Sequence, residues 1–281
     1  SMRPGETSLA LESRIFRRAL AGPVRRIARL DAARLFHKLL DRAGDRQRQS
    51  GLIGHLGDDQ PGESDGAPSE IEGHDDVRAV ILTGAGPRAF SAGGDIMQMV
   101  KSTPEEMAAR TDVRREANWH LATFTKPIIG AINGLAYGAG AQLTTMLDIR
   151  IGCEHAEIQF LAAKYGRANS TWSLPLVVGM PKAKELLYTG RPVKAEEAER
   201  IGLLNQIVPC AGLRDASLPM GRQITENDPR MVQAIKRVLQ DDMRLGWRER
   251  FDAEQNARKN KLKANSPREG FKAFLDRKGI R

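Results

Sequence analysis

Two glycine-rich segments contain the residue types best suited to chemistry. Residues 90–95 read FSAGGD and residues 137–142 read YGAGAQ, and each is expected to follow a strand and to begin a helix. A helix start exposes unpaired backbone N–H groups, and small residues let a ligand oxygen approach the backbone. Two such N–H groups on adjacent strands would converge on one carbonyl oxygen and form an oxyanion hole.

The alternative is that each glycine cluster serves only tight packing. Neither segment matches a phosphate-binding loop, because the GxxxxGK[ST] and GxGxxG patterns are missing. Taken singly, such a cluster is more often structural than catalytic. The two clusters lie about 45 residues apart and in the same strand–helix context, which favours a shared site.

Short apolar runs rich in β-branched side chains are expected to position the two segments as buried strands. These runs cover residues 77–84, 126–132 and 149–153. Asp95 is a suitable N-cap for the helix after the first segment. Further helices are expected over residues 104–123, 139–147, 181–189 and 194–201, and from about residue 228 onward. Strands that alternate with helices predict an α/β domain with parallel strands.

The first 70 residues differ from the rest of the chain. Residues 8–48 are rich in arginine and compatible with two helices divided at Pro23, and residues 50–68 are typical of a loop or disordered linker. The predicted organisation is therefore an atypical N-terminal segment, an α/β core and a helical C-terminal region, over residues 1–70, 71–225 and 226–281.

The net charge of +9 is unevenly distributed, because residues 226–281 hold 15 basic and nine acidic side chains. A basic region of this kind suits nucleic acid, the phosphates of a small ligand or a solvated helical face. The basic residues lack the interleaved aromatic residues of nucleic-acid-binding motifs. We therefore expect no nucleic-acid partner.

The two cysteines, Cys153 and Cys210, show no CxxC or metal-binding spacing. We expect both to be reduced thiols in a cytoplasmic protein. The histidines also form no ligand spacing, so no metal is predicted. No apolar run is long enough to predict a membrane span.

Longer stretches around the two glycine segments resemble the signature segments of the crotonase, or enoyl-CoA hydratase/isomerase, superfamily. They read AVILTGAGPRAFSAGGDIMQM and KPIIGAINGLAYGAGAQLTTMLDIRIG. LLYTGRPVKAEEAERIGLLNQIVP (residues 186–209) and PREGFKAFLDRK, near the C-terminus, are similar to two further family segments. The resemblance runs from about Ile71 to Lys278.

The resemblance implies a spiral of ββα units with a helical C-terminal region, usually assembled as a homotrimer or a hexamer. It implies an acyl-CoA thioester as the ligand, with coenzyme A as part of the substrate and no tightly bound cofactor. The thioester oxygen would be held by the backbone N–H groups of Gly94 and Ala139. Ala139 stands where the family usually has glycine, a change that should preserve the N–H group.

The resemblance also assigns residues to coenzyme A. The carbonyl groups near Ser91 and Ala92 would meet the adenine, and Asp95 lies in the same segment. Phe274 and Arg277 match C-terminal positions that cover coenzyme A, often across a subunit boundary. Binding of coenzyme A would explain the basic C-terminal region, because coenzyme A carries several negatively charged phosphates.

The sequence departs from the family at the two positions that usually carry out acid–base catalysis. Family hydratases use two glutamates to handle water and the α-proton. The aligned positions here are Gln142 and Ala162, and neither side chain accepts a proton at neutral pH. Gln142 retains the capacity to hydrogen-bond a water or an acyl group.

Two other departures concern the pocket wall and the start of the chain. The stretch between Gly166 and Gly179 is about three residues shorter than usual, and it contains Arg167, Asn169, Thr171 and Trp172. With Tyr165, these residues are expected to pack or cap, the alternative being substitute chemistry. The family's usual first strands are not recognisable in residues 1–70, either because that structure differs or because the source sequence has a shifted frame or start.

Isolated polar residues are expected to be structural. His120 follows Trp119 on a helix, and Glu116 lies one turn before it as a pairing partner. A role for His120 as a base is the alternative. Asp148 is expected to act as a cap or turn residue.

Two functions follow from these observations. The first is an acyl-CoA enzyme of the enoyl-CoA hydratase/isomerase type, a lyase or isomerase of fatty acid metabolism with an atypical active site. The second is a non-catalytic acyl-CoA binder or regulator that keeps the thioester grip without proton transfer. Another crotonase-type reaction, such as isomerisation, decarboxylation or hydrolysis, also remains open because an oxyanion hole serves all of them.

Overall fold

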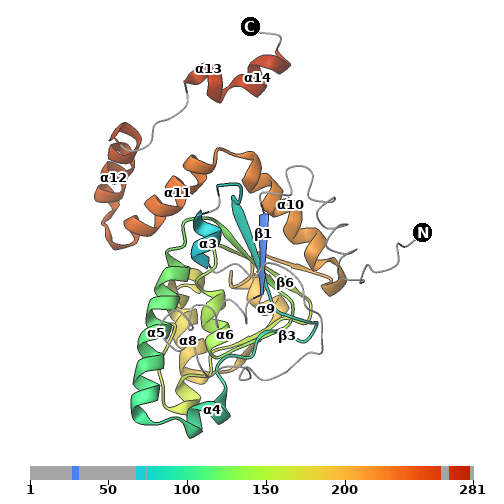
Figure 1. Cartoon of the computed structure of the whole chain (residues 1–281), viewed down its shortest axis with the longest axis vertical. Coiled ribbons are helices and arrows are strands. Elements are labelled where there is room, and N and C mark those ends of the chain that lie inside the picture. The colour runs from blue at the N-terminus through green and yellow to red at the C-terminus, as the bar shows by residue number, and fades with distance from the viewer. Residues whose placement is uncertain (1–26, 32–67, 74, 261–265, 279–281) are drawn as a thin grey trace, which may run out of the picture. The chain divides into compact units, whose positions relative to one another are not determined.

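A computed structural model of the chain describes residues 27–31, 68–73, 75–260 and 266–278 (Figure 1). The chain forms two compact units, Ser1–Glu226 and Asn227–Arg281. The strands of the first unit are β1 (Ile27–Asp31), β2 (Ala79–Thr83), β3 (Ala89–Ser91), β4 (Ile128–Ile132), β5 (Leu135–Tyr137), β6 (Ile149–Cys153), β7 (Glu157–Gln159), β8 (Pro192–Lys194) and β9 (Gln206–Val208). Its helices are α3 (Pro68–Gly73), α4 (Ile96–Lys101), α5 (Pro104–Ala122), α6 (Ala139–Thr144), η2 (Ala163–Tyr165), α7 (Leu174–Val178), α8 (Met180–Thr189), α9 (Ala195–Arg200), η3 (Cys210–Gly212) and α10 (Leu213–Glu226).

A five-stranded parallel sheet, in the order β1-β2-β4-β6-β9, is the centre of the first unit. All five residues of β2 and of β4 are buried, as expected for parallel strands covered on both faces. The predicted strands over residues 77–84, 126–132 and 149–153 are confirmed as β2, β4 and β6.

A second sheet, in the order β3-β5-β7-β8, faces the first across the main hydrophobic core. Val80 and Leu82 of β2 belong to the same core cluster as Phe90 of β3 and Ile158 of β7. The intervening residue of β2, Ile81, belongs to a second cluster that packs against α10. This alternation is the two-residue period of a strand with both faces buried.

The sequence prediction for the N-terminal segment is wrong at β1. Residues 8–48 were expected to be helical, but Ile27–Asp31 forms a strand that pairs in parallel with β2, from Ile27 opposite Ala79 to Asp31 opposite Thr83. Pairing with an already formed sheet edge overrides the local helix preference of an Arg- and Ala-rich segment. The rest of residues 1–67, including the predicted linker, lies outside the described residues.

The prediction of reduced thiols is also wrong. Cys153, the fully buried last residue of β6, forms a disulfide with Cys210, the first residue of η3. The pair closes a loop across a sequence separation of 57 residues. It fixes the end of β6 to the segment that leads into α10.

The second unit is helical, as predicted. It consists of α11 (Pro229–Asp241), η4 (Asp242–Arg244), α12 (Trp247–Asn260), α13 (Pro267–Gly270) and α14 (Lys272–Arg277). Asp228 caps α11 by accepting a hydrogen bond from the Arg230 amide at 2.9 Å. Large apolar side chains remain exposed along this unit, namely Ile235, Leu239, Met243, Trp247, Phe251, Phe271 and Phe274.

The predicted α/β class, with parallel strands and a helical C-terminal region, is therefore confirmed. In the part of the chain that the structure describes, no helix combines the length and the apolar character needed to cross a membrane.

Candidate functional site

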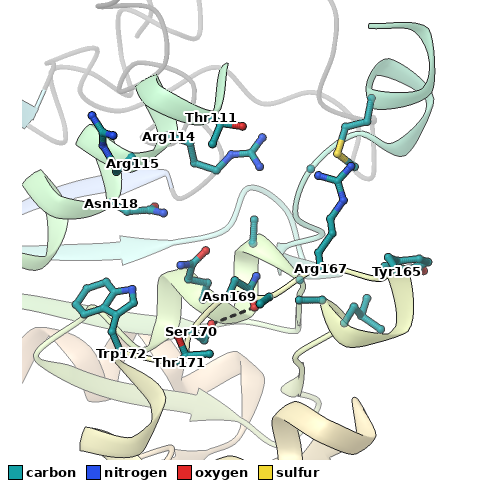
Figure 2. Close-up of a pocket in the computed structure, with 18 of the residues that line it drawn as sticks. Thr111, Arg114, Arg115, Asn118, Tyr165, Arg167, Asn169, Ser170, Thr171 and Trp172 are labelled. Atoms are coloured by element: carbon teal, nitrogen blue, oxygen red, sulfur yellow. Dashed lines mark hydrogen bonds between the residues drawn. The ribbon is translucent and has the colours of Figure 1, made fainter. Parts of the chain in front are cut away.

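The first unit contains a cavity of about 1230 Å³ to which both glycine-rich segments contribute (Figure 2). Its other walls come from α4, from one side of α5, and from η2 with the residues that follow it. The described residues that line it include Ala92, Gly94, Met99, Thr111, Arg114, Asn118, Trp119, Gly138, Ala139, Gln142, Ala162, Tyr165, Arg167, Asn169 and Trp172.

Adjacent strands hold the two glycine-rich segments side by side. The segment after β3 and the segment after β5 leave neighbouring parallel strands, with Ser91 opposite Ala136. A Cβ atom at Gly93 would lie 2.5 Å from the Tyr137 carbonyl oxygen and 3.1 Å from the Ala139 nitrogen. The segments are in direct backbone contact here, and a side chain at position 93 would prevent it.

The predicted oxyanion residues, Gly94 and Ala139, both line this cavity. Ala139 is the first residue of α6, so its N–H group has no acceptor within the helix. Among the described residues, no hydrogen-bond acceptor is found for the amide of Gly94 or of Ala139. Both amides therefore belong to the wall of the cavity with their donor capacity unused by that part of the protein.

Gln142 lies one turn into α6, is 9% exposed, and lines the same cavity. Its backbone is used within the helix, because its amide donates to the Gly138 carbonyl at 3.0 Å and its carbonyl accepts from Thr145. Its side-chain amide makes no hydrogen bond to the described residues. A buried amide group without a protein partner costs free energy, so this group is suited to a ligand or a water in the cavity.

Ala162, the second position at which the resemblance implies a glutamate, lines the cavity together with Gln142. Its carbonyl accepts the amides of Tyr165 at 3.0 Å and Arg167 at 2.9 Å, which turns the chain along the cavity wall. The structure thus brings together the two positions that the sequence comparison aligned, and neither presents a carboxylate.

The segment after η2 forms an open wall of the cavity. Tyr165 and Trp172 are 59% and 45% exposed, and Arg167 and Thr171 are also exposed. The prediction that these residues pack or cap is therefore wrong for these four. The wall is anchored by Ser173, whose hydroxyl lies 2.7 Å from that of Thr145 in a buried contact with α6.

Buried polar contacts fix the position of α6 itself. The Arg150 guanidinium donates to the carbonyl of Leu147 at 2.5 Å and to that of Leu203 at 2.9 Å. Burial lowers the pKa of Arg150, and the hydrogen bonds offset part of the cost of burying its charge. Asp148 is structural as predicted, because its carboxylate accepts the Ile128 amide at 2.7 Å.

Arg114 is the side chain that the sequence reasoning missed. It is half-buried on the cavity side of α5. Burial, followed by the positive charges of Arg167 and Arg110, lowers the pKa of Arg114. The only available signal was the spacing of Thr111, Arg114 and Asn118, which places three polar residues on one helical face.

The other predicted residues have different positions. Ala92 lines the cavity, and Ser91 ends β3 beside it. Asp95 lies immediately before α4, where its carbonyl accepts the Met99 amide at 3.0 Å. Phe274 and Arg277 lie on α14 of the second unit, and both are exposed.

His120 does not line the cavity among the described residues, and its partner differs from the predicted one. Its Nε2 lies 3.3 Å from a carboxylate oxygen of Glu72 on α3, and its ring packs edge-on against Phe124. Glu116 instead pairs with Arg115 at 3.1 Å. Glu72 also accepts the Thr125 amide at 2.8 Å, so this cluster joins α3 to the end of α5.

Comparison with known proteins finds relatives that match most of this chain. The model of the enoyl-CoA hydratase/isomerase family matches residues 66–280. YngF of Bacillus subtilis is 34% identical over 74% of this chain and 82% of its own length. The short-chain-enoyl-CoA hydratase of Clostridium acetobutylicum is 31% identical over 80% of this chain and 87% of its own length. The crystal structure of an enoyl-CoA hydratase from Bacillus anthracis superposes with a TM-score of 0.71 at 30% identity, covering 75% of this chain and 83% of that one.

Proposed function

Because the chain belongs to the enoyl-CoA hydratase/isomerase family, we propose that its cavity binds an acyl-CoA thioester and stabilises the enolate formed from it. The single observation that carries this proposal is the pair of glycine-rich segments in backbone contact. Together they contribute Gly94 and Ala139 to one cavity.

The backbone amides of Gly94 and Ala139 would hold the thioester oxygen. Negative charge builds up on this oxygen when the α-carbon loses a proton, or when a nucleophile adds to the β-carbon of an enoyl thioester. Donors that are already fixed in place stabilise that charge without reorganising. Glycine at position 94 leaves room for the thioester, since only the flexible Met99 side chain lies within 4 Å of a Cβ atom placed there.

Gln142 and Ala162 set the proposed chemistry apart from that of a two-glutamate hydratase. A hydratase must activate water and move a proton, and each task is usually done by a carboxylate of suitable pKa. Gln142 is able to orient a water or the acyl group by hydrogen bonds, but it does not accept the proton. The enzyme reading therefore requires an atypical proton transfer.

A second candidate is a non-catalytic acyl-CoA binder, which is favoured by the absence of a carboxylate at both aligned positions. A third is a different family reaction, such as isomerisation, decarboxylation or thioester hydrolysis, in which the same oxyanion hole is used. All three candidate functions use the same binding of the thioester oxygen, and they differ in the reaction at the α- and β-carbons.

We propose that the carbonyls near Ser91 and Ala92, with Asp95 beside them, hold the adenine end of coenzyme A. Phe274 and Arg277 match the C-terminal positions that cover coenzyme A in the family, often across a subunit boundary. Large exposed apolar side chains in the second unit support a proposed trimer or hexamer, because such surfaces usually mark a subunit interface. We also propose that the protein acts in the cytoplasm.

Turnover and binding, measured on the same preparation, test these candidates. Hydration of trans-2-butenoyl-CoA is followed by the loss of the conjugated thioester absorbance, and binding of butyryl-CoA is followed by calorimetry. Turnover with binding supports the hydratase. Micromolar binding without turnover, and without release of free thiol or CO₂ from other acyl-CoA esters, supports the binder. Absence of both would refute the acyl-CoA assignment.

A further inference from the structure

Two of the three tryptophans of the chain line the cavity. Trp119 lies on α5 and Trp172 lies between η2 and α7, and they are 61% and 45% exposed. Within the described residues, neither indole packs against another ring or a cation, and neither Nε1 atom donates a hydrogen bond. The cavity therefore contains large aromatic surfaces that this part of the protein does not cover, and covering them with a ligand gains free energy.

A series of buried contacts places Trp172 near the end of α6 that is remote from Ala139. The next residue, Ser173, has its hydroxyl 2.7 Å from that of Thr145. Thr145 in turn donates from its hydroxyl to the Gln142 carbonyl at 2.7 Å. Thr145 directly follows α6, about 9 Å along the helix axis from Ala139. An acyl chain that starts at the Ala139 amide and runs past Gln142 therefore ends near Trp172.

The adenine of coenzyme A is the competing aromatic partner for these indoles. The proposed function places adenine near Ser91, which packs against Gly140 at the start of α6. Trp172 lies toward the other end of the same helix, and this favours the acyl group. Tyr165 also lines the cavity, but Figure 2 shows Tyr165 and Trp172 at opposite ends of the wall segment. Only the two tryptophans are therefore assigned to the acyl group.

We propose that the acyl group accepted here carries an aromatic ring, so that the ligand is the CoA thioester of an aryl-substituted acid. The ring packs against the Trp172 indole, and Trp119 supplies a second aromatic surface, while Gly94 and Ala139 hold the thioester oxygen. Aromatic rings attract one another by more than the burial of their apolar area provides, whereas a saturated chain gains the area alone. This inference rests on the proposed function, because it assumes that the cavity takes an acyl-CoA.

The CoA esters of 3-phenylpropanoate and 3-cyclohexylpropanoate form a matched pair for the test, since they share one carbon skeleton and differ in the aromaticity of the ring. Burial of apolar area alone gives the phenyl ester no advantage, because the cyclohexyl ring is at least as apolar. We expect the wild-type protein to bind the phenyl ester about threefold to tenfold more tightly in calorimetry, as an aromatic pair provides. Trp172→Leu should remove most of this preference by weakening the phenyl ester alone, and Trp119→Leu should reduce it.

Trp247→Leu is the matched control and should keep the preference. Trp247 is the third tryptophan of the chain, is exposed on α12 of the second unit, and is not among the described residues that line the cavity. Retained affinity of Trp172→Leu for the cyclohexyl ester would show that the variant is folded.

Several results would overturn the proposal while leaving the acyl-CoA function intact. They are equal wild-type affinities for the two esters, tighter binding of the cyclohexyl ester, a preference that survives both Trp172→Leu and Trp119→Leu, and wild-type binding of butyryl-CoA without binding of either ring ester. Equal losses for both esters and for coenzyme A itself in Trp172→Leu would also overturn it, by assigning the indole to adenine. Binding of none of the three esters to the wild type would refute the proposed function as well.

Discussion

Gly140 of α6 packs directly against Ser91 of β3. A Cβ atom placed on Gly140 would overlap the Ser91 carbonyl oxygen and would lie 2.9 Å from both the carbonyl carbon and the Cβ atom of Ser91. This contact sets how closely the start of α6 approaches the segment that contains Gly94. The spacing between the two proposed oxyanion donors therefore depends on the lack of a side chain at Gly140.

Gly140→Ala should consequently destabilise the protein by about 1–3 kcal/mol, the usual cost of overpacking a site that cannot yield. The backbone of Ser91 is held in a parallel strand, so it has little freedom to move away. Urea unfolding measures the loss. Gly212→Ala is the control, since nothing lies within 4 Å of a Cβ atom there. If both variants are equally stable, the contact does not constrain the site.

The sequence was sufficient to find this part of the molecule because the signal there is local. Runs such as residues 128–132 contain no polar side chain and lie between Pro127 and the Asn133–Gly134 pair, and this pattern predicts a strand buried on both faces. The closeness of the two glycine-rich segments followed from their equivalent positions after consecutive strand regions. Gln142 and Ala162 were recognised for the same reason, as single positions within continuous motifs.

Features that depend on distant partners were not predictable in this way. β1 is stabilised by pairing with β2, which lies about fifty residues later, whereas its own residues favour a helix. Cys153 and Cys210 gave no spacing signal because the approach of β6 to η3 creates their bond. Arg114 and Arg167 belong to separate elements, and their charges act on one another only after the cavity wall has formed.

Removing one proposed oxyanion donor should weaken the thioester grip. Ala139→Pro eliminates the N–H group, and proline is tolerated because residue 139 is the first of α6 and follows a glycine. Loss of one such donor typically costs about 10²–10³-fold in turnover, so any measured activity should fall by this order and acyl-CoA binding should weaken. Activity assays and calorimetry check this prediction.

Ala139→Gly is the matched control for that substitution, because it keeps the amide at the same position. It should retain the wild-type affinity for butyryl-CoA. Unchanged binding by a correctly folded Ala139→Pro protein, judged by circular dichroism, would count against the assigned role of this amide.

Tyr137 provides a pH-dependent test of the strand that leads into the second glycine-rich segment. Its hydroxyl donates to the Glu157 carboxylate, and this hydrogen bond, with burial and the negative charge, raises the pKa of Tyr137 from 10.0 to about 12. The folded state thus retains the phenolic proton where the unfolded chain releases it. The resulting stabilisation is complete below pH 10.0 and is lost as the pH rises through about 12.

Tyr137→Phe should therefore be less stable than the wild type near neutral pH, and the difference should shrink as the solution becomes strongly alkaline. Denaturant unfolding of both proteins across this pH range measures the effect. A difference that stays constant into the alkaline range would contradict the predicted proton linkage.

Restoring both carboxylates is the sharpest test of what the cavity lacks. The double variant Gln142→Glu/Ala162→Glu places two glutamates on the wall that already contains Gly94 and Ala139. Position 142 is buried, so burial should raise the pKa of the new carboxyl group toward the range useful for proton transfer. Positioned acid–base groups contribute about 10²–10⁴-fold, and hydration of trans-2-butenoyl-CoA should rise by at least the lower figure above the wild-type rate.

The single variants separate the two roles. Gln142→Glu or Ala162→Glu alone should give much less than the double variant, because one carboxylate cannot both activate water and deliver the α-proton. Butyryl-CoA affinity serves as the control for an intact thioester grip. If the double variant binds the thioester normally but hydrates no faster than the wild type, missing carboxylates are not what limits hydration.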